Sequence, residues 1–214
     1  MDVAIVGNGI CALSSAFKLS LEISKPNKIY IVGNKNCEGS ASKAAAAMLN
    51  SYAELESTSL RTTIDNFNFD ISRKATKQWN KFNESINQEL LLNGFSNNNI
   101  DFSCGLDQGT FLINNTAADC IDDENYDFIL NSLRKYNESF QNIDPKDIPN
   151  YKPSQIKRAT RSIYIDNEGW INPRRFINKL ENLLKSLENI IFINENVNKL
   201  FCENSRIKYL LVGE

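Results

Sequence analysis

Histidine is absent from all 214 residues of this sequence. Its absence excludes imidazole metal ligands, Ser-His-Asp and Cys-His nucleophile pairs, and imidazole general bases. We therefore expect no metal site and no catalytic side chain of these kinds. Any chemistry that occurs must be carried by a cofactor or by other side chains.

Strong net charge, paired cysteines and long hydrophobic runs are also missing. The 24 basic and 26 acidic residues give a formal net charge of -2, and no basic patch stands out to attract nucleic acid or anionic lipid. The five cysteines are widely spaced and include no CxxC pair, which is typical of reduced thiols. No basic leader and no bilayer-length apolar run is present. We expect a cytoplasmic protein with neither a nucleic-acid nor a membrane partner.

The first 32 residues carry the pattern of one βαβ unit. Residues 2–6 form a short β-branched apolar run, residues 10–24 place apolar side chains at helical spacing, and residues 28–32 form a second apolar run. Strands that alternate with helices in this way predict a parallel sheet covered by helices.

The first strand and helix are joined by residues 7–12, GNGICA, which fit the pattern GxGxxA. Gly7 permits a tight turn, Gly9 lets the backbone approach a pyrophosphate, and Ala12 keeps the helix close to the sheet. The helix that begins at Ile10 adds free N–H groups and a partial positive charge. This arrangement predicts a dinucleotide site.

The end of the second strand departs from the dinucleotide pattern. An acidic residue that binds the ribose hydroxyls is expected there, but Gly33 followed by Asn34 occupies the place. The Asn34 amide can hydrogen-bond a ribose, but more weakly than a carboxylate. By this reasoning a glutamate at position 33 should tighten nucleotide binding. A nucleotide fold that no longer binds its ligand stays as the alternative.

The rest of the chain indicates an interrupted domain. The alanine-rich residues 40–49 predict a second helix, and residues 55–92 carry a long helical pattern. Short strand-like pieces and a proline-punctuated loop then indicate an insertion over residues 93–162. The α/β pattern resumes in residues 163–214, so residues 1–92 and 163–214 are expected to form one domain.

Several segments together resemble the D-amino-acid oxidase family of FAD-dependent oxidases, in particular the bacterial glycine oxidases. They include the glycine turn at 7–12, the alanine-rich run at 39–49, Gly109-Thr110, and EGWINPR at 168–174, in the same order as in that family. The resemblance extends over essentially the whole chain. It implies an α/β fold with an FAD-binding Rossmann-like domain, interrupted by a partial α+β substrate domain.

The resemblance also implies where FAD would bind. It places the first turn of the 40s helix near phosphate or ribityl oxygens, the later residues of that helix along the isoalloxazine ring, and the backbone of Val197 against the adenine. The family usually has glycine where Ala47 stands. The expected FAD-binding residues are Gly7, Gly9, Ile10, Ala12, Gly33, Asn34, Ala41, Ser42, Ala46, Ala47, Met48 and Val197.

The implied reaction is the oxidation of a small amine or amino acid to an imine, with hydride transfer to FAD and release of peroxide after reoxidation by oxygen. The substrate-binding tyrosine and arginine of the family would lie beyond Glu214, so we expect a C-terminally truncated chain that does not turn over amines by itself. Two alternatives stay open: a non-catalytic flavin-fold remnant or interaction module, and another nucleotide-dependent enzyme such as a dehydrogenase. The oligomeric state is also open, with a homo-oligomer as one alternative.

Four charged residues are weaker candidates for contact with a substrate. Glu54 and Glu56 follow the alanine-rich run and could approach a substrate channel, although exposed carboxylates usually lie on solvated surface. Arg174 and Arg175 could bind a carboxylate through two hydrogen bonds. The first turn of a surface helix is the more ordinary place for them.

Overall fold

The computed structural model describes residues 2–22, 27–34, 40–115, 117–154 and 158–213. Its contacts divide the chain into two compact units. Unit 1 comprises residues 1–47, 84–104 and 172–214, and unit 2 comprises residues 48–83 and 105–171. The chain thus changes unit at residues 47/48, 83/84, 104/105 and 171/172, whereas the sequence pattern placed breaks after residues 92 and 162. None of the described helices has the length and apolarity that crossing a membrane requires.

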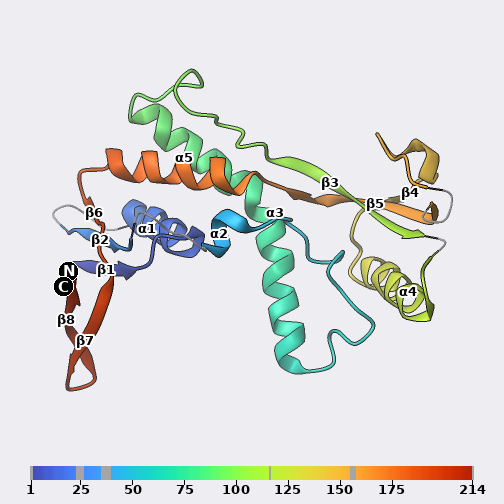
Figure 1. Ribbon diagram of the computed structural model, residues 1–214, viewed down its shortest axis with the longest axis horizontal. Helices are drawn as coiled ribbons and strands as arrows, with labels where there is room; N and C mark the ends of the chain where they lie inside the picture. Colours follow the sequence, from blue (N-terminus) through green and yellow to red (C-terminus); the bar gives the residue numbers. More distant parts are fainter. Residues whose placement is uncertain (1, 23–26, 35–39, 116, 155–157, 214) are drawn as a thin grey trace. The chain divides into compact units, whose positions relative to one another are not determined.

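Unit 1 is built on a three-stranded parallel sheet (Figure 1). Its strands are β1 (Val3–Val6), β2 (Ile29–Val32) and β6 (Ile190–Ile193), in the order β1-β2-β6. Helix α1 (Ile10–Glu22) connects β1 to β2, and helix α5 (Pro173–Ser186) precedes β6; the two helices pack on each other. The predicted βαβ unit and the α/β fold are confirmed.

The core of unit 1 follows from the spacing of apolar side chains along its helices and strands. Apolar side chains recur every three or four residues on the helices, and three of the four residues of β2 are buried, so a stripe of each helix is buried together with the sheet. Helix α5 begins at Pro173, because the Asn172 side chain accepts a hydrogen bond from Arg175 N at 3.1 Å and proline fits the first turn of a helix. The core residues are Leu13, Ala16, Phe17, Ile29, Ile31, Phe176, Leu180, Leu183 and Leu184.

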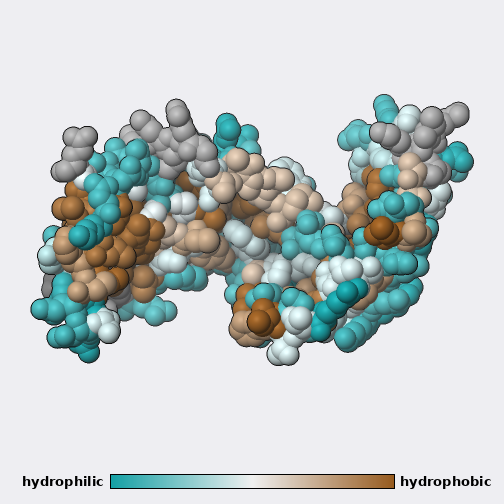
Figure 2. Space-filling view, turned by 60° about the horizontal axis from the view of Figure 1, so that its bottom comes forward, coloured by the Kyte–Doolittle hydropathy of each residue, from teal (hydrophilic) through white to brown (hydrophobic). Residues whose placement is uncertain are grey.

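A two-stranded hairpin ends unit 1. Strand β7 (Val197–Glu203) pairs with β8 (Arg206–Val212) in antiparallel fashion. Four of its apolar or aromatic side chains are about half exposed, namely Leu200, Ile207, Tyr209 and Leu211. Hydrophobic surface gathers over the part of unit 1 that carries the sheet and this hairpin (Figure 2, left). The hairpin therefore presents apolar side chains to solvent.

Unit 2 combines an antiparallel sheet with helices. The strand order is β3-β5-β4, with β3 at Asp107–Asn115, β5 at Ala159–Trp170 and β4 at Phe140–Asn142. Helix α4 (Cys120–Lys135) and the first part of α3 (Thr63–Leu92), up to Asn83, belong to this unit, together with a 3-10 turn at Pro145–Asp147. The core cluster contains Tyr52, Leu55, Phe69, Tyr126, Ile129, Leu130, Leu133, Ile163 and Ile165.

The helix expected over residues 40–49 is much shorter in the structure. Helix α2 spans only Ala41–Ala44, and Ala45 is already extended with φ -61° and ψ 144°. Ala47 has φ 53°, a left-handed conformation that cannot continue an α-helix. Beyond it, Leu49 N donates to Gly169 O at 2.7 Å, so the chain pairs with β5 instead. Pairing with the sheet has overridden the helix propensity of the alanines.

A buried carboxylate fixes the segment that follows. Glu168, at the end of β5, is 2% exposed and accepts hydrogen bonds from the backbone N–H groups of Ser51 (2.7 Å), Tyr52 and Ala53 (3.3 Å). Burial raises the pKa of this carboxyl, and the three N–H groups oppose that rise. Glu168 therefore ties three consecutive residues to the strand.

A second buried carboxylate holds α3 and β5 together within unit 2. Glu138 accepts hydrogen bonds from Lys77 Nζ at 2.8 Å, Asn167 Nδ2 at 2.6 Å and the Tyr52 hydroxyl at 3.3 Å. Burial disfavours the ionised form, but the bonds from Lys77 and Asn167 outweigh it and lower the pKa of Glu138. Burial also raises the pKa of Tyr52 to about 12.

The lowered pKa of Glu138 predicts acid sensitivity. A carboxyl whose pKa is lower in the folded state stabilises the fold above its unfolded pKa, and that stabilisation is lost as the pH falls through the folded value. We expect Glu138→Gln to flatten the decline in the free energy of unfolding between about pH 5 and about pH 3. Urea unfolding at several pH values measures this slope. Glu124→Gln, at an exposed position of α4, is the control, and equal slopes in both variants would contradict the assignment.

Candidate functional site

The site begins at the turn between β1 and α1. Gly7 has φ +114°, a conformation that a side chain would strain, and its N–H donates to Val32 O at 2.7 Å. A Cβ atom at Gly7 would lie 3.9 Å from Ala12 Cβ, which is ordinary contact. The turn therefore needs glycine at position 7 for its backbone angle, and Ala12 lies next to it as the pattern GxGxxA predicts.

Gly9, Ile10 and Ser42 meet at the start of α1. The Ser42 hydroxyl accepts a hydrogen bond from Ile10 N at 3.1 Å, and a Cβ atom added to Gly9 would lie 3.0 Å from Ser42 Oγ. Gly9 is thus needed for close approach. Two parts of the sequence that lie 32 residues apart are joined at one helix N-terminus, where N–H groups and the helix dipole favour an anion.

The end of β2 packs tightly against the same turn. A Cβ atom at Gly33 would lie 3.1 Å from Gly7 C, 3.1 Å from Asn8 Cγ and 3.2 Å from Asn8 Cβ. Asn8 Nδ2 donates to Asn34 O at 2.7 Å. A glutamate at position 33 would therefore crowd Gly7 and Asn8 by a few tenths of an ångström, and its tighter binding of a nucleotide stays a prediction.

A pocket of about 290 Å³ opens at the carboxyl ends of the parallel strands. Asn8, Gly33 and Asn194 follow β1, β2 and β6, and ligands of open parallel sheets bind at this edge. Phe192, Ile193, Glu181 and Lys185 complete the lining; Glu181 and Lys185 pair at 3.1 Å. The pocket borders the glycine turn and offers amide groups together with an aromatic wall.

The remaining expected residues are less closely joined to the turn. Ala41 is the first residue of α2, and both Ala41 and Ala46 are exposed. Ala47 is half-buried and left-handed, while Met48 is 48% exposed and pairs with Trp170 of β5. Val197 begins β7, half-buried, opposite Val212. The Gly39 end of the alanine-rich run lies outside the described residues.

Apart from Gly33, sequence reasoning missed the residues that line the pocket. Asn194 could have been found, because it directly follows the apolar run of residues 190–193, which is typical of a buried strand. Asn8 is an unspecified position of the glycine pattern, and Glu181 and Lys185 lie on the polar side of an amphipathic helix. No sequence pattern distinguishes Asn8, Glu181 and Lys185 from other polar residues.

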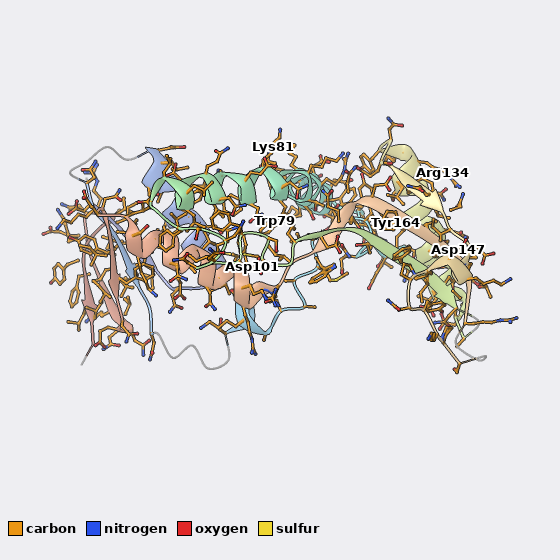
Figure 3. All side chains as sticks on the ribbon, turned by 90° about the horizontal axis from the view of Figure 1, so that it is seen from above. Trp79, Lys81, Asp101, Arg134, Asp147 and Tyr164 are labelled. Atoms are coloured by element: carbon orange, nitrogen blue, oxygen red, sulfur yellow. The ribbon has the colours of Figure 1, made fainter. Side chains whose placement is uncertain are left out.

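The two arginines at the start of α5 are exposed and contact other residues of unit 1. Arg175 forms an ion pair with Asp101 at 3.1 Å, beside α5 (Figure 3), and Arg174 Nε donates to Lys43 O at 3.5 Å. Further along α5, the fully buried Lys179 donates to Phe102 O at 2.7 Å, and burial lowers its pKa. Within the described ranges no group of three or more Cys, Asp or Glu side chains is placed to hold a metal ion.

The family model of the FAD dependent oxidoreductases, DAO, matches residues 2–212. Among solved structures, glycine oxidase from Bacillus cereus ATCC 14579 is 18% identical with a TM-score of 0.72, over 100% of this chain and 53% of that chain. Iminodiacetate oxidase from Chelativorans sp. BNC1 is 16% identical with a TM-score of 0.70, over 98% of this chain and 50% of that chain. L-amino acid deaminase from Proteus vulgaris is 14% identical with a TM-score of 0.67, over 99% of this chain and 44% of that chain.

These solved structures share the fold of the chain at low sequence identity. The chain spans about half the length of each of them. No curated protein sequence matches it.

The crowding at Gly33 leads to a stability prediction. Gly33→Ala should lower the free energy of unfolding by about 1–3 kcal/mol, because the added methyl group overpacks against Gly7 and Asn8. Asn8→Gly removes two of the three crowding atoms, so the double variant should lose less than the sum of the two single variants. Urea unfolding of all four proteins gives the coupling. Additive losses would mean that position 33 has free space.

The left-handed conformation of Ala47 leads to an opposite prediction. Ala47→Gly should raise the free energy of unfolding by about 0.5–1 kcal/mol, because glycine adopts a positive φ without strain. Ala46→Gly, at the neighbouring exposed residue without a positive φ, should lower it by about 0.5–1 kcal/mol. Thermal unfolding compares the two variants. A loss of stability in both would place Ala47 in an ordinary conformation.

Proposed function

The chain belongs to the FAD dependent oxidoreductase family, and from this premise we propose that it holds FAD at the glycine turn of unit 1, in a protein that oxidises a small amine or amino acid. The single observation that carries the proposal is the junction of Gly7, Gly9 and Ser42 at the start of α1. There the backbone is kept free of side chains at a helix N-terminus.

The pyrophosphate would lie against the first turn of α1. The N–H groups of the first turn lack partners within the helix, and Gly9 leaves its side open. The Ser42 hydroxyl accepts from Ile10 N and keeps its own proton, which it can donate to a phosphate oxygen. These features fit an anionic group.

The adenosine end would enter the pocket at the carboxyl ends of β1, β2 and β6. Because Gly33 has no side chain, ribose recognition would come from amides: Asn8 and Asn194 line the pocket, and Asn34 lies beside Asn8. Neutral amides bind a hydroxyl more weakly than a carboxylate does. The backbone of Val197 is proposed to contact the adenine.

The flavin ring would be approached by the segment that follows α2. We assign Ala41 and Ser42 to phosphate or ribityl oxygens, and Ala46, Ala47 and Met48 to the isoalloxazine side. Small side chains at 41, 46 and 47 allow a flat ring to come close to the backbone. In this assignment unit 1 is the FAD-binding part and unit 2 is a partial substrate domain.

When bound, FAD supplies the redox chemistry by accepting a hydride from the carbon next to the amine, which leaves an imine. The residues of this chain bind and orient the cofactor, and we assign no proton transfer to any of them. The solved structures named above include a glycine oxidase, an iminodiacetate oxidase and an L-amino acid deaminase, which supports an amine or amino acid as substrate. The two oxidases support oxygen as acceptor.

The cofactor site is tested by Gly9→Val. The valine side chain would fill the space beside Ser42 Oγ where the pyrophosphate must lie, so the purified variant should lose nearly all of its flavin absorbance. Cys11→Val, at an exposed position of the same turn, is the control and should retain flavin. Circular dichroism checks the fold of both variants.

If Gly9→Val does not fold, Gly9→Ala combined with Ser42→Gly removes the crowding atoms and still narrows the approach to the backbone. Unchanged flavin content in a folded Gly9 variant would remove the glycine turn from the site.

The reaction is tested separately by anaerobic bleaching of bound flavin with a panel of small amines and amino acids. Because the chain spans about half the length of the solved structures above, the test uses the longest natural reading frame that contains residues 1–214, and we expect bleaching there. Flavin that stays oxidised with every compound in the longer frame would contradict the amine oxidase proposal and leave FAD binding intact.

A further inference from the structure

The proposed FAD site lacks a carboxylate at the place where dinucleotide sites usually have one. In the dinucleotide pattern an acidic side chain at the end of the second strand accepts hydrogen bonds from the ribose hydroxyls. Gly33 occupies that place here, and a Cβ atom there would already lie 3.1 Å from Gly7 C. The neighbouring Asn8 and Asn34 are neutral amides. A ribose beside Gly33 therefore needs a charged acceptor from another element.

One carboxylate does line the pocket that borders Gly33. The pocket of about 290 Å³ is lined by Asn8, Gly33 and Asn194 at the strand ends, and Glu181 reaches it from helix α5. Glu181 is the only Asp or Glu among the described residues of this lining, and all of them belong to unit 1. A pocket of this size holds one small ligand, so a nucleoside placed beside Gly33 also lies near Glu181.

The Glu181 side chain is held by contacts that leave one of its oxygens open. Lys185 Nζ donates to Glu181 Oε2 at 3.1 Å, and the same ammonium lies 5.4 Å from the centre of the Phe192 ring, within cation–π range. These contacts connect the pair on α5 to strand β6. Glu181 Oε1 accepts no hydrogen bond from the part of the chain that the structure describes. Each carboxylate oxygen can accept more than one hydrogen bond, so Oε1 has capacity for a ligand.

We propose that Glu181 is the ribose-binding carboxylate of this chain, supplied by helix α5 instead of the end of β2. The assignment rests on the proposed FAD site. Glu181 Oε1 would accept from the hydroxyls of the adenosine ribose, while Lys185 keeps hold of Oε2. A hydrogen bond to a charged acceptor is stronger than one to a neutral amide, so Glu181 should contribute more than Asn8 or Asn194.

An ordinary surface ion pair is the other explanation of Glu181 and Lys185. Residues four apart on a helix often pair, and exposed pairs contribute little. The Glu181 side chain is 25% exposed, against 48% for Lys185, so the carboxylate is the more enclosed of the two. A pair that served only the surface of α5 would not respond to the hydroxyl groups of a nucleotide.

The assignment is tested by comparing ADP with 2′,3′-dideoxy-ADP, which lacks both ribose hydroxyls, in calorimetric titrations of the 214-residue chain. The unaltered chain should bind ADP at least about tenfold more tightly than dideoxy-ADP. Glu181→Gln should weaken ADP binding about five- to tenfold and reduce the preference for ADP to about threefold or less, because a neutral amide replaces the charged acceptor.

Glu22→Gln, at the exposed end of α1, removes the same charge outside the pocket lining and should keep the full preference for ADP. A full preference in Glu181→Gln, whether or not its affinity for ADP falls, would overturn the assignment and leave the proposed FAD site intact. No saturable binding of ADP to the unaltered chain would contradict the proposed FAD site itself, and the role of Glu181 with it.

Discussion

The architecture of unit 1 depends on the lack of space where β1, β2 and α1 meet. Gly7 is required by its backbone angle, Gly9 by the Ser42 hydroxyl at 3.0 Å, and Gly33 by the turn itself at 3.1 Å. A side chain at position 9 would crowd the Ser42 hydroxyl, and one at position 33 would crowd the turn. Their absence keeps N–H groups of the helix open to an anion, and this opening is what the FAD proposal rests on.

The fold of unit 1 could be predicted where burial imposes a clear residue period. Three of the four residues of β2 and every third or fourth residue of α1 and α5 are buried, so the apolar pattern of the sequence predicted the sheet and its helices. The helix expected over residues 40–49 was wrong in length. Alanines favour a helix locally, but the bond from Leu49 N to Gly169 O, made with a residue 120 positions away, decided the conformation.

The candidate site was predictable only where its residues form a local pattern. The glycine pattern is local, so Gly7, Gly9 and Ala12 could be identified from their order alone. Gly33 was recognised, but only as a missing carboxylate, and its close packing against Gly7 and Asn8 was not foreseen. The contacts of Ser42 with Ile10, and of Asn8 with Asn34, join residues far apart in the sequence and depend on packing that no single segment encodes.

The central claim is that the glycine turn and the adjoining pocket bind the pyrophosphate and adenosine of FAD. Competition distinguishes this from general affinity for the flavin ring, because ADP carries both groups and riboflavin carries neither. Titration of the chain with FAD, followed by flavin fluorescence, should give one site per chain from which ADP displaces FAD and riboflavin does not. Displacement by riboflavin but not by ADP would contradict the account.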